Sequence, residues 1–147
     1  MQGIAFIILA VFLSLSPVEA SVSYDNPKQQ AAYEQITIAL TYIKYGQLEE
    51  ALGAIQESIR LYPSFDGYYN QGLIYMDKKE YDKSAASFEK AHEMNPEDPG
   101  LNYNYGVVLL ELGKFKEARP KFERLLKDDP QDQHLKDLLK KAVEGAK

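Results

Sequence analysis

Two segments of this chain repeat one pattern of residues at a spacing of 34 positions. The pattern joins aromatic, small and proline residues in a fixed order. The matching pairs are Tyr69 with Tyr103, Asn70 with Asn104, Gly72 with Gly106, Phe88 with Phe122, Glu89 with Glu123 and Pro96 with Pro130. A period of about 20 to 50 residues is typical of supersecondary units that bury their apolar faces against one another. The sequence therefore predicts a stack of repeated units.

Each copy of the pattern predicts two helices. In the first copy, residues spaced three and four apart form an apolar stripe, and the stripe is interrupted around residues 77–79 before it resumes at Tyr81. The second copy has its turn at Gly113 and Lys114. Each copy ends on Asn-Pro or Asp-Pro, where the proline lacks an amide hydrogen and biases the preceding residue away from helix. Each unit is therefore expected to be a helix, a turn and a second helix.

These positions resemble the tetratricopeptide repeat (TPR) family. The shared landmarks are a small residue within the first helix, an aromatic residue opening the second, then a small residue, a phenylalanine and a terminal proline. They are Gly72, Tyr81, Ser84, Phe88 and Pro96, and Gly106, Phe115, Ala118, Phe122 and Pro130. The tryptophan that the family often has near the start of the first helix is absent, with Tyr68 and Asn102 in its place. The resemblance implies an all-α fold, a right-handed TPR superhelix.

A third, more degenerate copy precedes these two. Leu48, Ala51, Ile55 and Pro63 align with the landmarks of the next copy at an offset of 33. After the last copy, an amphipathic segment carries leucines on one face and lysines on the other, as a helix that covers the end of a repeat stack should. We therefore expect a flexible lead at 21–26, repeats at 27–63, 65–98 and 99–132, and a capping helix at 133–147, which gives three helix pairs and one cap.

The first 20 residues differ from the rest of the chain. An apolar run at 4–15 is followed by Ser16-Pro17 and by small residues up to Ala20. This order predicts a secretory signal peptide cleaved after Ala20, since the run is short for a bilayer core of about 30 Å. No lysine or arginine precedes the run, so an uncleaved membrane anchor and a buried N-terminal helix are the alternatives. We expect an exported protein, periplasmic or secreted, that contacts a membrane only if residues 1–20 are retained.

Composition argues against several functions. The formal net charge is −5, so neither nucleic acid nor anionic lipid is an expected partner. There is no cysteine, and the two histidines, His92 and His134, lie 42 residues apart without a second ligand at metal-binding spacing. His92 is expected to be a half-buried structural residue. No glycine-rich phosphate loop is present. We predict no enzyme activity, cofactor, metal or small-molecule substrate.

The resemblance implies a binding site for a protein partner. In TPR superhelices the first helices of the pairs line a concave groove that binds an extended or helical peptide. The corresponding residues are Ile36, Leu40, Ile43, Tyr69, Asn70, Leu73, Met76, Tyr103, Asn104, Val107 and Leu110. Some members grip a terminal carboxylate with lysine and arginine, but Gly100 and Asn104 stand where the last repeat would carry them. An apolar or aromatic-bearing segment is therefore the expected ligand, held by a non-catalytic adaptor or assembly factor.

Two alternatives concern how the apolar residues of the groove are used. They could be core residues covered by the closing helix, because apolar residues at helical spacing are common in cores. An exposed apolar surface of this size is instead typical of an interaction site. The protein could also be a structural subunit that self-associates through this surface. A separate alternative, which does not depend on this surface, is a membrane-tethered scaffold that retains residues 1–20.

Overall fold

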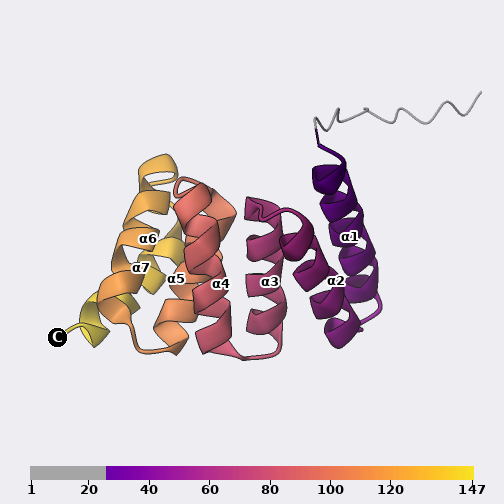
Figure 1. Cartoon of the computed structure of the whole chain (residues 1–147). Coiled ribbons are helices and arrows are strands. Elements are labelled where there is room, and N and C mark those ends of the chain that lie inside the picture. The colour runs from indigo at the N-terminus through magenta and orange to yellow at the C-terminus, as the bar shows by residue number, and fades with distance from the viewer. Residues whose placement is uncertain (1–25) are drawn as a thin grey trace, which may run out of the picture.

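The computed structural model describes residues 26–147, and this part of the chain contains seven α-helices and no strand (Figure 1). The helices are α1 (Pro27–Lys44), α2 (Leu48–Leu61), α3 (Phe65–Asp77), α4 (Tyr81–Met94), α5 (Pro99–Glu111), α6 (Phe115–Asp128) and α7 (Gln133–Gly145). None of these helices is long and apolar enough to cross a membrane. The segment expected to be a signal peptide, 1–20, and the lead up to residue 25 lie outside the described residues.

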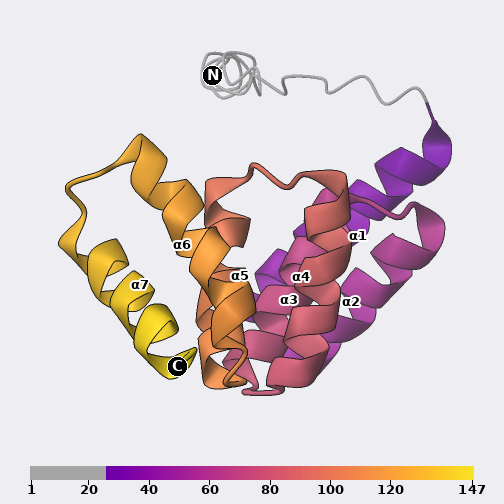
Figure 2. The same cartoon turned by 90° about the vertical axis from the view of Figure 1, so that its left-hand side faces the viewer.

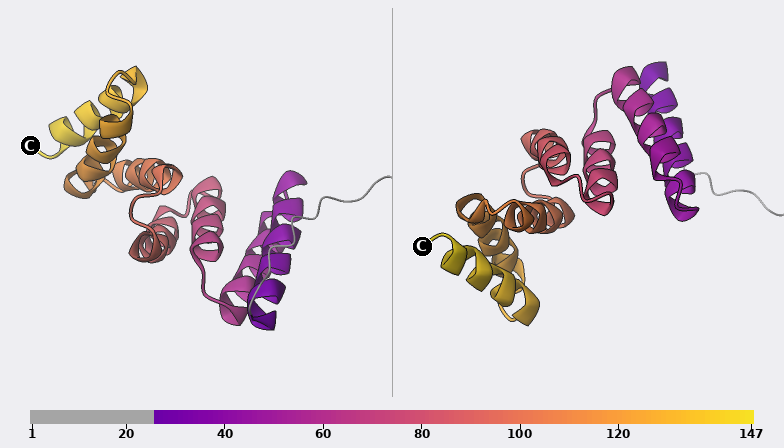
Figure 3. Two further views of the ribbon diagram at one scale, coloured as in Figure 1. Left: turned by 90° about the horizontal axis from the view of Figure 1, so that it is seen from above. Right: turned by 90° about the horizontal axis from the view of Figure 1, so that it is seen from below.

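The helices form antiparallel pairs that follow one another along the molecule. Contacts are most extensive within α1 and α2, α3 and α4, and α5 and α6, and α7 packs against α6. Successive pairs join through α2 with α3 and α4 with α5. Seen from above and below, the pairs form a staggered row with α1 at one end and α7 at the other (Figure 3). The expected all-α stack of helix pairs is therefore confirmed.

Local sequence signals explain where the helices start. The side chains of Asn26, Ser64, Asp98 and Asp132 each accept a hydrogen bond from a backbone N–H in the first turn of α1, α3, α5 and α7. These caps satisfy amides that have no partner within the helix. Each of the four capped helices is thus the first helix of a pair or the closing helix.

The turns inside the pairs share one backbone conformation. Gly46, Lys79 and Gly113 occupy equivalent positions in the three pairs, and their φ angles are 72°, 60° and 68°. Glycine adopts this left-handed region without steric penalty, whereas lysine does so at some cost in free energy. The second pair therefore keeps the turn of its neighbours despite lacking their glycine.

The core is built on a contact between a phenylalanine and a glycine in the second and third pairs. Phe88 and Phe122 are fully buried. A Cβ atom added to Gly72 would lie 2.4 Å from the Phe88 ring, and one added to Gly106 would lie 2.7 Å from the Phe122 ring. The Ser84 hydroxyl also donates a hydrogen bond of 2.8 Å to the Gly72 carbonyl. The small residues of the pattern are therefore needed for close packing of the two helices of a pair.

Candidate functional site

The first helices of the pairs and the closing helix form an inner row. Helix α3 contacts both α1 and α5, and α5 also contacts α7. The row can be followed in Figure 2, where α5 lies between α7 and the α3–α4 pair. Because equivalent positions on these helices repeat every 33 or 34 residues, their side chains line up along one side of the stack. This side carries the residues expected to bind a partner.

Ten of the eleven expected residues are at least partly exposed. Leu40 is 49% exposed. The others are half-buried: the asparagines Asn70 and Asn104, and seven apolar or aromatic residues that pack against the core with part of their surface, Ile43, Tyr69, Leu73, Met76, Tyr103, Val107 and Leu110. We call these ten residues the inner strip. The seven half-buried apolar and aromatic residues of the strip contribute to the core and still present part of their surface to solvent.

Ile36 does not belong to the inner strip. Its side chain is only 6% exposed and packs in the N-terminal part of the core beside Ala39 and Ile55. Ile36 stands at the repeat position of Tyr69 and Tyr103, but its side chain is shorter. It lies at a small hollow of about 60 Å³ that is also lined by Tyr33 and Tyr62. The prediction that Ile36 lines an open groove was therefore wrong.

Tyr69 links two helices of the inner row. Its hydroxyl accepts a hydrogen bond of 2.9 Å from the side-chain amide of Asn104, so α3 and α5 are joined. Its ring stacks on Phe65 with centroids 5.6 Å apart and is tilted against Phe88 at 5.9 Å. Burial raises the pKa of Tyr69, an effect that the hydrogen bond from Asn104 opposes and the charge of Asp98 reinforces. The hydroxyl is therefore neutral and retains a proton to donate.

Tyr103 makes an equivalent link between the next two helices of the inner row, α5 and α7. Its hydroxyl lies 3.0 Å from Nε2 of His134, which connects α5 to α7. Sequence reasoning missed His134, because it considered histidine only as a metal ligand or general base. The repeat itself contained the signal, since His134 follows Gly100 by 34 positions and so belongs to the inner row.

The two asparagines differ in their contacts. Asn104 donates to Tyr69, as described above, whereas Asn70 donates a hydrogen bond of 2.8 Å to the backbone carbonyl of Asp66 in its own helix. A primary amide has two N–H groups and a carbonyl oxygen, so one hydrogen bond leaves it further capacity. Both side chains are half-buried. Each asparagine could therefore hydrogen-bond a ligand while its existing hydrogen bond holds the side chain in place.

A hollow of about 400 Å³ continues the inner strip between α5 and α7. Its apolar wall includes Val107, Leu110 and Leu138, and its charged residues include Lys141 and Glu144. Helix α7 contacts α5 and α6 but no other described helix. The closing helix therefore borders the inner strip at this hollow and does not cover Tyr69, Leu73 or Met76 on α3.

A second polar cluster lies between the outer helices. His92 is half-buried, and its Nε2 lies 2.9 Å from Nζ of Lys121, which sits 5.0 Å from the ring centroid of Tyr105. The other ring nitrogen of His92 is buried with no hydrogen-bond partner in the described part of the chain. Burial and the charge of Lys121 lower the pKa of His92. Within residues 26–147, no group of histidine or acidic side chains could hold a metal ion.

Comparison with known proteins identifies the architecture. Two family models described as tetratricopeptide repeat match residues 36–99 and 75–142. The chain is 32% identical over 89 residues to superkiller complex protein 3 of Homo sapiens, and 31% identical over 94 residues to the photosystem I assembly protein Ycf3 of Prochlorococcus marinus. These alignments cover 60% and 61% of this chain, but only 6% and 54% of the two relatives.

A solved structure supports the same assignment. The first TPR domain of Spaghetti (RPAP3), bound to the HSP90 peptide SRMEEVD, superposes with a TM-score of 0.73 at 20% identity, covering 80% of this chain and 94% of that domain. The likeness at this identity concerns the fold. Together with the family models, it shows that the chain belongs to the tetratricopeptide repeat family and folds as an all-α TPR superhelix.

Proposed function

We propose that this protein is a non-catalytic adaptor or assembly factor that binds an apolar segment of a partner protein along the inner strip. The observation that carries the proposal is the partial exposure of ten residues on α1, α3 and α5, the first helices of the three pairs, next to a hollow of about 400 Å³. Contiguous apolar surface of this kind is typical of an interaction site. Its two tyrosines provide large, rigid contact area with little loss of conformational freedom.

The chemistry of the inner strip favours an apolar segment over an acidic tail. Near its middle stand Gly100 and Asn104, and a Cβ atom at Gly100 would lie 2.9 Å from the Tyr69 hydroxyl. The surface there consists of a hydroxyl and an amide, without a lysine or arginine at either position. The RPAP3 domain named above holds an acidic peptide. We infer that this chain selects an uncharged ligand, with hydrogen bonds to its backbone and apolar contacts to its side chains.

The ligand can be found without knowing the partner. Peptides are selected from a random phage-displayed library on the full chain, and the best one is labelled and titrated by fluorescence anisotropy. Leu40→Glu and Val107→Glu place a charge at each end of the inner strip, and we expect both to weaken binding about tenfold or more. Ile38→Glu is the control, because Ile38 lies on the same helix as Leu40 and is similarly exposed, at 42%.

The outcomes separate the hypotheses. The proposal is supported if apolar or aromatic peptides are enriched, and if their binding is weakened by Leu40→Glu and Val107→Glu but is unchanged by Ile38→Glu. Selection of acidic C-terminal peptides, or binding that is unaffected by both variants of the inner strip, would contradict it.

We also propose that the protein acts outside the cytoplasm after export. The proposal rests on the apolar run at 4–15, the Ser16-Pro17 break after it and the small residue Ala20 at the expected cleavage site. Determination of the N-terminal residue of the protein purified from its native cells tests it. A chain that begins at Ser21 is expected. A chain that still contains residues 1–20 would favour the membrane-tethered scaffold.

A further inference from the structure

We infer that α1 pairs with α1 of a second copy through a face that the inner strip does not use. In the second and third pairs, one side of the first helix packs against the preceding pair. In α5 these positions are Leu101, Tyr105 and Val108, which are at most 9% exposed. In α3 they include Gly67, whose added Cβ atom would meet Ile59 at 3.0 Å, and Ile74, which is 1% exposed. Every internal copy of this face is therefore covered by a helix.

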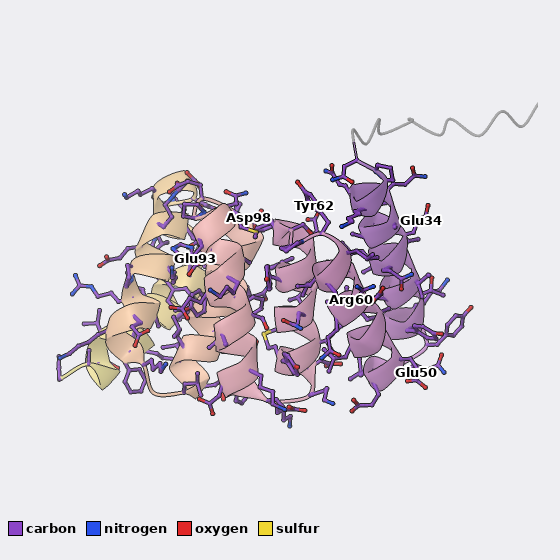
Figure 4. All side chains as sticks on the ribbon, viewed as in Figure 1. Glu34, Glu50, Arg60, Tyr62, Glu93 and Asp98 are labelled. Carbon is purple, nitrogen blue, oxygen red and sulfur yellow. The ribbon has the colours of Figure 1, made fainter. Side chains whose placement is uncertain are left out.

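The same positions on α1 are exposed. They are Glu34, Ile38 and Thr41, and together with Tyr45, the exposed residue that follows the last turn of α1, we call them the edge face. Ile38 is 42% exposed and Tyr45 is 70% exposed. In Figure 4 the side chain of Glu34 points away from the rest of the stack. The edge face thus continues the interfaces between α2 and α3 and between α4 and α5, but among the described residues no helix covers it.

The two ends of the stack differ in polarity. At the other end, α7 carries Lys136, Lys140, Lys141 and Glu144 beside a single exposed apolar residue, Val143, and a mainly polar outer surface of this kind is what a terminal repeat needs to remain soluble. The edge face of α1 has one charged residue and two large apolar ones. Stacking of α1 on the charged end of another copy would bury those lysines, so an open chain of copies is disfavoured.

The edge face is complementary to itself once the half-buried residues beside it, Ala31 and Tyr42, are included. Ala31, Ile38 and Tyr45 are spaced by seven residues, the spacing at which two paired helices meet repeatedly. A two-fold axis at Ile38 places small Ala31 of each copy opposite large Tyr45 of the other. It also places Glu34 opposite Tyr42, whose hydroxyl can donate to the carboxylate. A parallel pair would instead oppose two Glu34 carboxylates and two Tyr45 rings, so the antiparallel arrangement is the one that fits.

The pairing would give a symmetric dimer with two inner strips. Because the edge face and the inner strip lie on different sides of α1, both can be occupied at once. A partner with two binding segments would then be held more tightly than by one strip. This inference does not depend on the proposed function, since a dimer can form whether or not the inner strip binds a peptide.

The first test compares two glutamate substitutions in the full chain by sedimentation equilibrium over a wide range of concentration. The wild type is expected to reach twice the mass of one chain. Ile38→Glu should raise the dissociation constant about a hundredfold, because the dimer would bury two unpaired carboxylates, while Leu40→Glu should leave it unchanged. Far-UV circular dichroism confirms that both variants are folded. A monomeric wild type, or association that depends on Leu40 or on neither residue, overturns the inference.

The second test uses the absence of cysteine from the chain. A single Ile38→Cys substitution is expected to give a disulfide-linked dimer under mild oxidation, because the axis brings residue 38 of both copies together. Tyr45→Cys should not, since its two copies would be about 21 Å apart along the helices. Combining Ala31→Cys with Tyr45→Cys should restore the crosslink. Crosslinking by Tyr45→Cys alone contradicts the antiparallel pair. Association through the apolar segment at 4–15 would be seen as a dimer unaffected by either glutamate.

Discussion

Replacing glycine by alanine is expected to change the stability of the protein in opposite directions at two positions, Gly72 and Gly53. The difference arises because Gly72 packs against Phe88. In Gly72→Ala, the new Cβ atom would lie 2.4 Å from two carbons of the Phe88 ring, closer than real Cβ contacts allow. The ring cannot simply retreat, because Phe88 is fully buried and packs against Tyr69 and Tyr105. Overpacking of this kind typically costs about 1–3 kcal/mol. Alanine in a helix interior offsets about 1 kcal/mol of that cost.

Gly53 gives the matched control. It is an exposed interior residue of α2, and apart from its chain neighbours and the nearby backbone of its own helix no atom lies within 4 Å of the Cβ position. Gly53→Ala therefore has the gain in helix propensity without a clash, and we expect it to stabilise the protein by about 1 kcal/mol. Gly72→Ala should instead lower the free energy of unfolding by up to about 2 kcal/mol, the overpacking cost less the gain in propensity.

The assay is urea unfolding followed by far-UV circular dichroism, with the two variants and the wild type measured together. Opposite shifts of the midpoint are expected, downward for Gly72→Ala and upward for Gly53→Ala. If Gly72→Ala is as stable as Gly53→Ala, the reasoning about close packing within the second pair is refuted.

Three further predictions concern other parts of the molecule. Pro120, an exposed residue inside α6, removes one helical hydrogen bond, so Pro120→Ala should stabilise the protein to urea by up to about 3 kcal/mol, and no gain would refute this. A double-mutant cycle with Tyr69→Phe and Asn104→Ala should give a coupling of about 1 kcal/mol, whereas additive effects would contradict the hydrogen bond. Because the pKa of His92 is lowered in the folded protein, the contribution of His92 to the free energy of unfolding should be complete above pH 6.5 and should decrease as the pH falls below that value. His92→Gln should flatten this pH dependence, and an unchanged profile would exclude His92 as its source.

The fold followed from the sequence because its signals are local. Asn-Pro and Asp-Pro pairs mark the ends of units, and the spacing of three and four residues marks the helices. The landmark Gly72 was expected as a small residue within the first helix of its unit, and the structure places it directly against Phe88. Signals of this kind act within one repeat, so they do not require knowledge of how the repeats are placed in space.

The inner strip was less predictable because it depends on contacts between repeats. Ile36 has the right position in the pattern, but its depth depends on the length of its side chain and on nearby Tyr33 and Tyr62. The bonds that fix Asn104 and His134 join residues 35 and 31 positions apart, and no local pattern specifies them. The edge face was missed as well, because its exposure is seen only when α1 is compared with its buried equivalents.

Mapping of the bound peptide tests the central claim most directly. The full chain is labelled with ¹⁵N and titrated with the peptide selected on it, while amide chemical shifts are followed by NMR. The largest shift changes are expected on α3 and α5, around Tyr69, Leu73, Tyr103 and Val107. Changes confined to the outer helices α2, α4 and α6 would show that the inner strip is not the binding site.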